Sequence, residues 1–508
     1  MNLLSSSSVF AFYTLLSRVL GYLRDILIAF FLGTSIYADA FFVAFRIPNT
    51  FRRLFAEGAF NAAFIPSYAE AKLKDGKSGK KFADEIFSLL LFFLIFLILI
   101  IEIFTPFLVY LIAPGFYEDT DKFTLAVELT RITFPFLLFV CLSSLLSGVL
   151  NMNNKFAAAA AAPIILNLIL ILFLLISFYN NLNITKSLSI GVTLSGVLQF
   201  IFLLIYTKEF YLPSIKLIFK FNKKIIFFLK KLLPSIFSSG ITQINILVGT
   251  IIASFQQSAI SYLYYADRVY QINLAIAGIA VGTVVLPSLT KSIKLNDIES
   301  INLIQNRSIE LSLLLSIPAA LGLFIASSEI VNSLFGYGSF NSQDIFYTSL
   351  ALGFFALGVP AFALIKVLSN FYFARDNTKI PFYISLISMV LNIFISVSLF
   401  KTFGFIIIPI ATSVSTWIAV IIYFILLIRG KYLNFEKKYF VNFLKILLST
   451  ILMCLFLYFG LDYFEDKFEY TNKFKLIYLI IVVGLSTALY LFIIKILGVL
   501  NLKNYKLK

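Results

Sequence analysis

The chain has 508 residues, of which 60% are hydrophobic and 13% charged, a composition that excludes a water-soluble or disordered protein. It has 41 basic and 25 acidic residues, no histidine, and two cysteines, Cys141 and Cys454, that lie in apolar runs. These counts exclude zinc sites, histidine-based catalytic triads and redox CxxC pairs. We therefore expect a polytopic membrane protein whose polar chemistry uses Arg, Lys, Asp, Glu and hydroxyl groups.

Long apolar runs follow one another along the chain. A helical span needs about 20 mostly apolar residues, whereas a β-barrel wall shows alternating segments of about ten. Because the runs are continuous, the sequence predicts an all-α protein with fourteen transmembrane helices. The predicted spans are residues 8–32, 36–68, 84–112, 126–150, 157–179, 187–207, 226–255, 259–289, 303–326, 344–371, 380–400, 404–428, 439–460 and 475–499.

The charge of the connections alternates. The second and sixth connections carry five basic residues each and the eighth carries two, with Lys230, Lys231 and Arg307 at the start of the spans that follow, whereas the odd-numbered connections between them are nearly free of basic residues. Lys and Arg accumulate in cytoplasmic loops, so the even-numbered connections and both chain termini are predicted to be cytoplasmic. The same rule explains the net charge of +16, and no nucleic-acid partner is expected although basic proteins bind phosphate backbones.

Short matches indicate an internal repeat. Ala38-Asp39 recurs as Ala266-Asp267, and Leu166-Asn167 recurs as Leu391-Asn392, at closely similar separations along the chain. Six spans per repeat give two lobes of the same orientation, related by an axis along the membrane normal and suited to alternating access. The predicted domains are residues 1–224 and 225–432, which form two pseudo-symmetric six-helix lobes, and residues 433–508, which hold two further helices.

Arginine is concentrated in the predicted spans. Eight of the ten Arg lie within the predicted spans, whereas only six of the 31 Lys do. A charge at mid-membrane costs about 2.5–3.5 kcal/mol unless it faces water or a partner. Because the planar guanidinium binds carboxylate or phosphate bidentately, these arginines indicate an anion-binding site. For each single Arg, snorkelling to the interface or internal ion pairing stays open.

The first span carries three charges. Arg18, Gly21 and Asp25 share one helix face, and Arg24 lies about a third of a turn away. Gly21 permits close approach of another helix at that face. Counting the charged residues of the first, second and eighth spans together leaves an excess of two positive charges, which an anionic ligand can neutralise. That set is Arg18, Arg24, Arg46, Arg52, Arg53 and Arg268 against Asp25, Asp39, Glu57 and Asp267.

The second span contains two helix-weakening residues. Pro48 removes an internal hydrogen bond and Gly58 lowers helix stability, so we expect a bent or broken span whose carbonyls line a cavity. Arg53 and Glu57 are four residues apart and can pair on one helix face.

Four motifs around these charges resemble one family. They are SRVLGYLRD at 17–25, ADAFFVAFRIPN at 38–49, RRLFAEGAF at 52–60 and YYADR at 264–268. Together they resemble the MurJ/MviN lipid II flippases, and the resemblance covers essentially the whole chain. It implies membership of the multidrug/oligosaccharidyl-lipid/polysaccharide exporter superfamily, with two six-helix lobes, a central cationic cavity and two C-terminal helices that form a hydrophobic groove.

The resemblance also implies a function. Such a protein moves lipid II, the undecaprenyl-diphosphate-linked disaccharide-pentapeptide, from the cytoplasmic to the periplasmic leaflet of the bacterial inner membrane by alternating access. This step serves peptidoglycan biosynthesis, and thereby cell wall biogenesis and cell shape. The resemblance therefore implies a transporter and not an enzyme, with no catalytic residue and no metal site.

The candidate substrate-binding residues combine the resemblance with the charge pattern. The full set is Arg18, Arg24, Asp25, Asp39, Arg52, Arg53, Glu57 and Arg268. The family requires the residues that match Arg18, Arg24, Asp39, Arg52 and Arg268, and its site is lined at the position of Asp25. Many members have Glu at Gln271 and Pro at Asn273, so the family's roles at these two positions are not carried over.

Several alternatives stay open. A flippase for another polyprenyl-diphosphate-linked oligosaccharide fits the arginines nearly as well, whereas a multidrug exporter for cations does not. Asp119-Thr120-Asp121 matches a glycosyltransferase DxD pattern, but on the predicted periplasmic side, where nucleotide sugars are absent, so we interpret it as a solvated loop. No cofactor is expected; coupling to the membrane potential or to Na⁺ or H⁺ stays open. Lipid II and membrane lipids are the expected partners, and binding of cell-wall synthesis or division proteins stays open.

Overall fold

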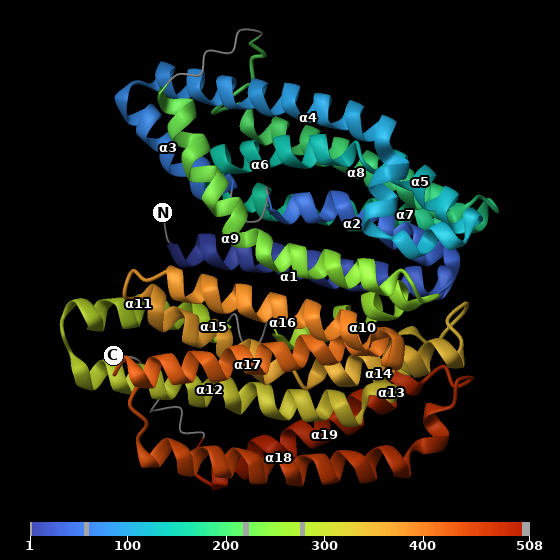
Figure 1. Cartoon of the computed structure of the whole chain (residues 1–508), viewed down its shortest axis with the longest axis vertical. Coiled ribbons are helices and arrows are strands. Elements are labelled where there is room, and N and C mark those ends of the chain that lie inside the picture. Colours follow the sequence, from blue (N-terminus) through green and yellow to red (C-terminus); the bar gives the residue numbers. More distant parts are fainter. Residues whose placement is uncertain (1–2, 55–59, 217–222, 275–279, 500–508) are drawn as a thin grey trace. The chain divides into compact units, whose positions relative to one another are not determined.

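The computed structural model describes residues 3–54, 60–216, 223–274 and 280–499, and every regular element in these ranges is a helix (Figure 1). The all-α prediction is thereby confirmed. Within these ranges, nine helical segments are long and apolar enough to cross a membrane by length and composition. The protein is therefore a multi-pass membrane protein. The count of fourteen spans stays a prediction, because other helices are shorter or more charged than those nine.

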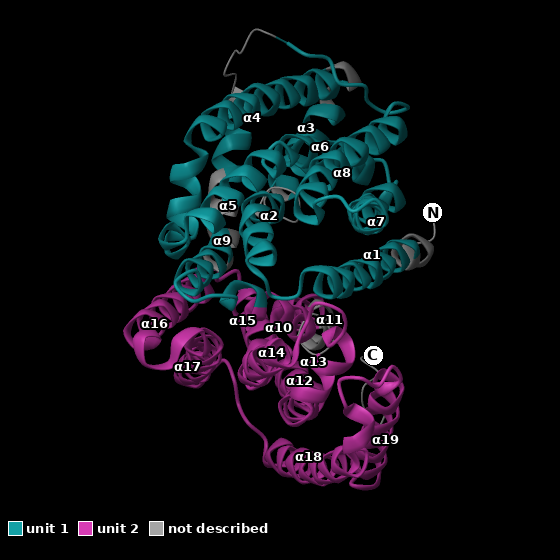
Figure 2. Ribbon diagram, turned by 90° about the vertical axis from the view of Figure 1, so that its right-hand side faces the viewer, with its two compact units in different colours: residues 1–261 teal, residues 262–508 magenta. Residues whose placement is uncertain are grey.

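The chain packs as two compact units, residues 1–261 and 262–508 (Figure 2). The helices of the first unit are α1 (Leu3–Leu32), α2 (Ile36–Leu54), α3 (Phe60–Lys74), α4 (Gly76–Ile112), the 3₁₀ turn η2 (Pro114–Glu118), α5 (Thr120–Thr133), α6 (Phe136–Met152), α7 (Phe156–Tyr179), α8 (Ile184–Thr207) and α9 (Lys223–Ala253). Helix α10 (Ala259–Leu274) begins in the first unit and continues into the second.

The second unit contains the remaining helices. They are α11 (Ala280–Lys294), α12 (Ile298–Ile325), α13 (Ser327–Phe335), α14 (Ser342–Ala356), α15 (Val359–Phe373), α16 (Lys379–Phe403), η4 (Gly404–Ile406), α17 (Ile407–Arg429), α18 (Lys437–Tyr463), η5 (Glu465–Phe468) and α19 (Lys475–Ile496). The two units are defined by which helices pack together, and on this basis α9 belongs to the first unit. The predicted domains follow the sequence repeat instead, and they stay a prediction.

An aromatic ladder forms part of the core of the first unit. Phe60, Phe64 and Tyr68 recur every four residues, which places them on one face of α3. Their rings stack in sequence with centroids 5.3 and 5.4 Å apart, and Phe64 also stacks on Phe82 of α4 at 6.0 Å. Phe228 of α9 meets Phe60 edge-on at 5.7 Å. The spacing of aromatic residues along α3 therefore fixes this helix against α4 and α9.

Two of the predicted spans are broken at a proline. Residues 126–150 form α5 and α6, which meet at Pro135, and residues 344–371 form α14 and α15, with Pro360 in the first turn of α15. Proline lacks the N–H that would continue the helical hydrogen bonds, and its ring clashes with the preceding turn. The two prolines have the same separation along the chain as the repeated Leu-Asn pair.

At each break a freed backbone carbonyl is hydrogen-bonded by a side chain of another helix. Carbonyls at the end of a helix lack an intrahelical partner, and lipid offers none. In the first unit the Ile132 carbonyl accepts a hydrogen bond from the Thr193 hydroxyl of α8. In the second unit the Leu357 carbonyl accepts one from Trp417 Nε1 of α17 at 2.9 Å. Ile132 and Leu357 are separated by the same length of chain as the two prolines, so the two breaks are equivalent features of the repeat.

Helix α12 begins with a side-chain cap outside the apolar part of the helix. The Asp297 carboxylate accepts a hydrogen bond from the Ser300 backbone N–H at 3.0 Å. Hydrogen bonds from the Ser300 side chain and backbone lower the pKa of Asp297 below its ordinary value of 3.8. The ionised carboxylate is therefore the form that stabilises the start of α12.

We predict that Asp297→Ala lowers the melting temperature of the purified protein at neutral pH and that this difference disappears in acid. Because the folded-state pKa is lowered, the stabilisation is fully present above pH 3.8 and is lost as the pH falls through the lowered value. Asp297→Asn is the matched control, since an amide caps a helix without titrating. A melting difference for Asp297→Ala that is equal at all pH values would contradict this assignment.

Candidate functional site

A buried charge cluster lies where α1 packs on α7. Arg24 donates from Nε and Nη2 to Asp25 Oδ1, at 3.0 and 2.7 Å, and from Nη1 to Asn167 Oδ1 at 2.9 Å. Arg24 and Asp25 are 4% and 1% exposed, so these two charges compensate each other inside the protein. Arg18 is exposed on α1. The structure thus brings Arg24 and Asp25 together and leaves Arg18 at the surface.

Asp39, in the first turn of α2, is fully buried. Its Oδ2 accepts from Lys122 Nζ at 2.7 Å and from the Ser258 N–H at 3.1 Å. Its Oδ1 accepts from the N–H and hydroxyl of Ser261, at 3.0 and 2.5 Å. One carboxylate therefore connects the start of α2, the start of α5 and the first turn of α10. A buried carboxylate with these donors is a structural junction as well as a candidate site residue.

Lys122 is a residue that the sequence did not single out. It lies in the first turn of α5, directly after the acidic connection, yet it is 4% exposed, and its ammonium lies 4.1 Å from the centre of the Phe116 ring. Asp119 in the same connection is the N-cap of α5 and accepts from the Lys122 N–H at 3.1 Å. The DxD pattern here therefore contains a helix cap. The one available signal was that Lys122 is a single cation directly after three acids within positions 118–121.

The arginines of α2 are half-buried. Arg46, Arg52 and Arg53 all have intermediate exposure. Arg52 donates from Nε to Asn49 Oδ1 at 3.0 Å, one helical turn earlier. Pro48 lies inside the continuous helix α2, so the expected break does not fall at this residue. Glu57, the predicted partner of Arg53, and Gly58 lie outside the described residues.

Arg268 lies on α10 in the second unit. Its guanidinium packs over the ring of Tyr264, 4.8 Å from the centre, and Nη2 donates to the Tyr264 hydroxyl at 2.9 Å. On the same helix Gln271 Nε2 donates to Asp267 Oδ2. A glutamate at position 271 would place a second carboxylate beside Asp267, so the glutamine reduces the negative charge next to Arg268. The side chain of Asn273 lies outside the described part of α10.

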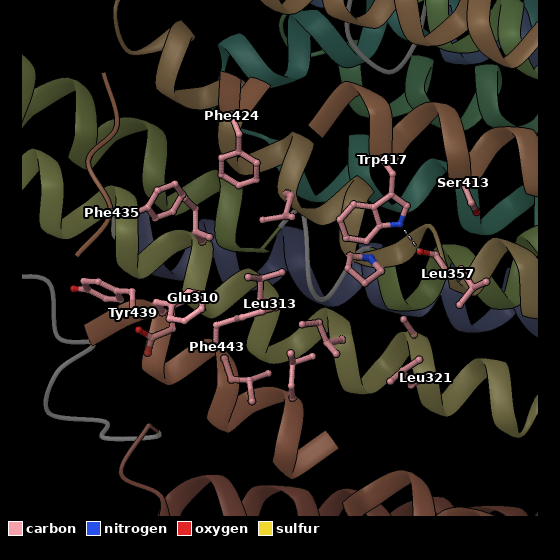
Figure 3. Close-up of a pocket in the computed structure, with 18 of the residues that line it drawn as sticks. Glu310, Leu313, Leu321, Leu357, Ser413, Trp417, Phe424, Phe435, Tyr439 and Phe443 are labelled. Carbon is pink, nitrogen blue, oxygen red and sulfur yellow. Dashed lines mark hydrogen bonds between the residues drawn. The ribbon is translucent and has the colours of Figure 1, made fainter. Parts of the chain in front are cut away.

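The second unit contains a partly open apolar cavity of about 1030 Å³ (Figure 3). Its wall comes mainly from α12, α15, α17 and α18 and includes Leu313, Ile317, Leu321, Leu364, Trp417, Phe424, Phe443 and Ile446. The cavity is at the upper limit of ordinary ligand pockets, about 300–1,000 Å³. The resemblance implied a groove formed by the last two helices. In the described residues α18 lines the cavity, whereas the other walls belong to helices of the second half and none to α19.

One end of this cavity is polar. Figure 3 shows Glu310 and Tyr439 near each other at one end, with Trp417 farther along the cavity, toward Leu357 and Ser413. Glu310 is 7% exposed and its Oε2 accepts from Asn442 Nδ2 at 3.2 Å. The Trp417 indole bonds to the Leu357 carbonyl at 2.9 Å, so it presents its ring to the cavity with its N–H satisfied. The space suits a long hydrocarbon chain that ends near polar groups.

Known proteins match this chain over most of its length. The family model described as "Lipid II flippase MurJ" matches residues 28–479. A "Probable lipid II flippase MurJ" of Rickettsia prowazekii (strain Madrid E) is 41% identical over 421 residues, which cover 82% of either chain. One from Rhizobium tropici is 41% identical over 429 residues, which cover 83% of this chain and 80% of that one.

Solved structures give the same result. A structure described as "Lipid II flippase MurJ, inward closed conformation" matches with a TM-score of 0.82 at 29% identity and covers 96% of this chain and 98% of that one. An inward-facing multidrug resistance MATE family transporter of the MOP superfamily matches with a TM-score of 0.65 at 15% identity, covering 80% and 93%, which shows the fold alone.

The fold and its buried charges define a multi-pass helical membrane protein with the fold of the MOP-superfamily transporters. Within that class, the chain belongs to the lipid II flippase MurJ family. The resemblance drawn from the four sequence motifs is thereby confirmed.

We predict that Asp39 and Lys122 depend on each other for stability. Removing one partner of a buried ion pair leaves an uncompensated charge, so Asp39→Asn and Lys122→Met should each cost about 3–5 kcal/mol, seen as a large fall in melting temperature. The double variant should lose less than the sum of the two single losses. The control is Lys186→Ala, which removes the exposed pair with Glu128, 2.7 Å apart and 45% and 47% exposed. Its cost should be about 0–1 kcal/mol. Additive losses for Asp39 and Lys122 would show that the two side chains act independently.

Proposed function

We propose that this protein is a lipid II flippase of the bacterial inner membrane, a transporter and not an enzyme. The carrying observation is the family match over residues 28–479. Buried and half-buried arginines on α1, α2 and α10 support it, because such residues suit a diphosphate. In this proposal both chain termini are cytoplasmic, as the basic even-numbered connections predict. The substrate moves from the cytoplasmic to the periplasmic leaflet and supplies peptidoglycan synthesis.

The chemistry of the substrate sets what the protein must supply. Lipid II carries a diphosphate, sugars and a peptide, and these polar groups would be left without hydrogen bonds in hydrocarbon. In the proposed mechanism Arg24, Arg52 and Arg268 bind the diphosphate, while the sugars and peptide stay in a hydrated cavity. Rocking of the two repeats then exposes the head group to the other side of the membrane.

The two buried aspartates, Asp25 of α1 and Asp39 of α2, have distinct proposed roles. Asp25 holds Arg24 in the absence of substrate, and binding of a diphosphate weakens this internal pair by offering the guanidinium a stronger anion. Asp39 holds the junction of α2, α5 and α10 in the conformation described here. Arg53 and Glu57 stay in the candidate set, and their pairing stays a prediction because Glu57 lies outside the described residues.

The apolar cavity of the second unit is the proposed site for part of the polyprenyl tail. A polyprenyl chain has no polar atoms, so it fits a wall of Leu, Ile, Phe and Trp side chains. Keeping the tail in this cavity or in lipid means that only the head group has to cross the polar path. The groove expected from α18 and α19 is accordingly extended to a cavity that α18 shares with α12 and α17.

The membrane potential is the proposed contributor to the energy of transport. Outward movement of anionic charge from a negative interior is favoured by about 2.3 kcal/mol per charge per 100 mV. If the arginines move with the substrate, much of this charge is cancelled, and the potential acts on the return of the empty protein. Coupling to Na⁺ or H⁺ stays open as an addition.

A second candidate substrate is another polyprenyl-diphosphate-linked oligosaccharide. The arginines bind the diphosphate that both substrates share, so these side chains do not distinguish between the two head groups. Rescue of a strain that depends on lipid II export separates the two candidates.

We predict that replacing any of the three diphosphate-binding arginines by lysine abolishes transport. In a strain depleted of its lipid II flippase, the wild-type chain should restore growth, whereas Arg24→Lys, Arg52→Lys and Arg268→Lys should fail at normal membrane levels. Lysine keeps the charge but loses the second hydrogen bond, about 1.5–3 kcal/mol or 10- to 100-fold in affinity. Arg429→Lys, at the exposed end of α17, is the matched control and should rescue.

Rescue by all three lysine variants would refute bidentate recognition of the diphosphate. Failure of a well-expressed wild-type chain, with rescue of a strain lacking a different polyprenyl-diphosphate flippase, would favour the second candidate substrate.

We predict that a polar group in the apolar cavity blocks transport of the tailed substrate. Leu321→Asn places an amide in the cavity wall, whereas Phe324→Asn changes an exposed position of the same helix, 45% exposed and outside the cavity lining. Both variants add an asparagine to the same membrane helix at a similar free-energy cost of insertion, so a difference in their transport activity is due to the cavity. Flipping of lipid II in proteoliposomes should fall several-fold for Leu321→Asn alone. Equal activity of the two variants would mean that the tail does not use this cavity.

A further inference from the structure

Asn167 connects α7 to two turns of α1. Its Oδ1 accepts from Arg24 Nη1 at 2.9 Å, and its Nδ2 donates to the Ser17 carbonyl at 2.8 Å. Ser17 and Arg24 are seven residues apart, which is two turns of one helix. Asn167 is 6% exposed and belongs to the repeated Leu-Asn pair, but it is outside the candidate set of site residues.

The amide of Asn167 has one orientation that satisfies both neighbours. A guanidinium can only donate hydrogen bonds and a backbone carbonyl can only accept them. The amide oxygen must therefore face Arg24 and the amide nitrogen must face Ser17. Aspartate would lose the donor to Ser17, and leucine would lose both bonds. Asparagine is thus the side chain of this size that fits the site.

Asn167 packs against α1 at Gly21. A Cβ atom at position 21 would lie 3.4 Å from Asn167 Nδ2 and 3.5 Å from Oδ1, which is ordinary van der Waals contact. The close approach that was expected at Gly21 is therefore the approach of this one side chain.

We propose that Asn167 is a positioning residue for Arg24, which sets the orientation of the guanidinium for an anionic diphosphate. The inference rests on the proposed function. Arg24 and Asp25 together are neutral, and a neutral amide as the third member leaves them so. A carboxylate at position 167 would make the buried cluster negative and repel a diphosphate. Asn167 thus orients the guanidinium of Arg24 without adding a competing charge.

The repeat supplies a matched control. Asn392, the counterpart of Asn167, is also 6% exposed, but its Nδ2 donates to the Thr412 hydroxyl at 3.0 Å and its Oδ1 accepts from the Ser396 hydroxyl at 3.1 Å. Both of these hydroxyl partners are uncharged. Replacing Asn392 therefore removes a buried asparagine of equal exposure without touching the Arg24 cluster.

The test measures binding of undecaprenyl diphosphate to the purified full chain in lipid nanodiscs. The proteins are wild type, Asn167→Leu, Arg24→Ala, the double variant of these two, and Asn392→Leu. We expect Asn167→Leu to raise Kd about tenfold, as the loss of one hydrogen bond to a charged group predicts, and Asn392→Leu to leave it unchanged. In the Arg24→Ala background, Asn167→Leu should have no further effect.

This last comparison separates positioning from general support of the fold. A residue that only stabilises α1 against α7 would weaken binding by the same factor in both backgrounds, and that result would overturn the inference. An unchanged Kd for Asn167→Leu would also overturn it. If Asn167→Leu does not fold, Asn167→Asp keeps the size of the side chain and should bind at least tenfold more weakly than wild type. Wild-type affinity for Asn167→Asp would overturn the inference.

The same measurement distinguishes this inference from the proposed function. If the wild-type chain does not bind undecaprenyl diphosphate, the proposed function fails and the role of Asn167 fails with it. If wild type binds and the Asn167 variants bind equally well, only the role of Asn167 fails.

Discussion

A polar group inside a bilayer has no water to bond with, and most of the structure follows from this constraint. Each buried charge described above has its partner within the chain: Arg24 with Asp25 and Asn167, and Asp39 with Lys122 and two serines. The carbonyls freed at the two helix breaks are also bonded, by a threonine in one half and a tryptophan in the other. Helix packing is therefore fixed by hydrogen bonds as much as by apolar contact, since lipid is as apolar as leucine.

This constraint also bears on the proposed transport mechanism. In that mechanism an anionic substrate reaches an arginine that already has an internal partner, so it has to exchange for that partner or share the guanidinium with it. A ligand shifts a conformational equilibrium only through a difference in affinity between the two states. Under the proposed function, internal partners such as Asp25 would provide such a difference, because they stabilise the empty protein and would lose that bond when substrate binds. The proposed affinity for diphosphate is then set in part by the strength of the Arg24–Asp25 pair.

The sequence predicted most helices, because a long uninterrupted apolar run has few alternatives in a membrane. It did not predict which prolines end a helix. Pro163 lies inside α7 without a break, Pro106 accompanies a kink at Phe104, and Pro135 separates two helices. The outcome depends on whether a side chain from another helix can bond the freed carbonyl, as Thr193 does, and a local pattern does not contain that information.

The candidate site was predictable in part for a similar reason. Charge counting and family motifs located Arg24 and Asp39, but their partners on other helices, Asn167 and Lys122, lie 143 and 83 residues away in the chain. Lys122 was not singled out, and the neighbouring Asp119-Thr120-Asp121 was interpreted as a solvated loop, since consecutive polar residues are usually a loop. Asn167 was noticed as part of a repeat with no role attached. Pairing across helices is set by packing, so the geometry of both clusters came only from the structure.

The Asp39 cluster also bears on how the protein is made. Its members leave the ribosome at very different times, because Lys122 follows Asp39 by 83 residues and Ser261 by 222. During synthesis α2 therefore enters the membrane before its carboxylate has any of these partners. The carboxylate gains its ammonium partner when α5 arrives, and its remaining donors only when the first turn of α10 has been made. Completion of this junction is thus a late event in the membrane insertion of the first unit, because it requires Ser261, the last residue of that unit.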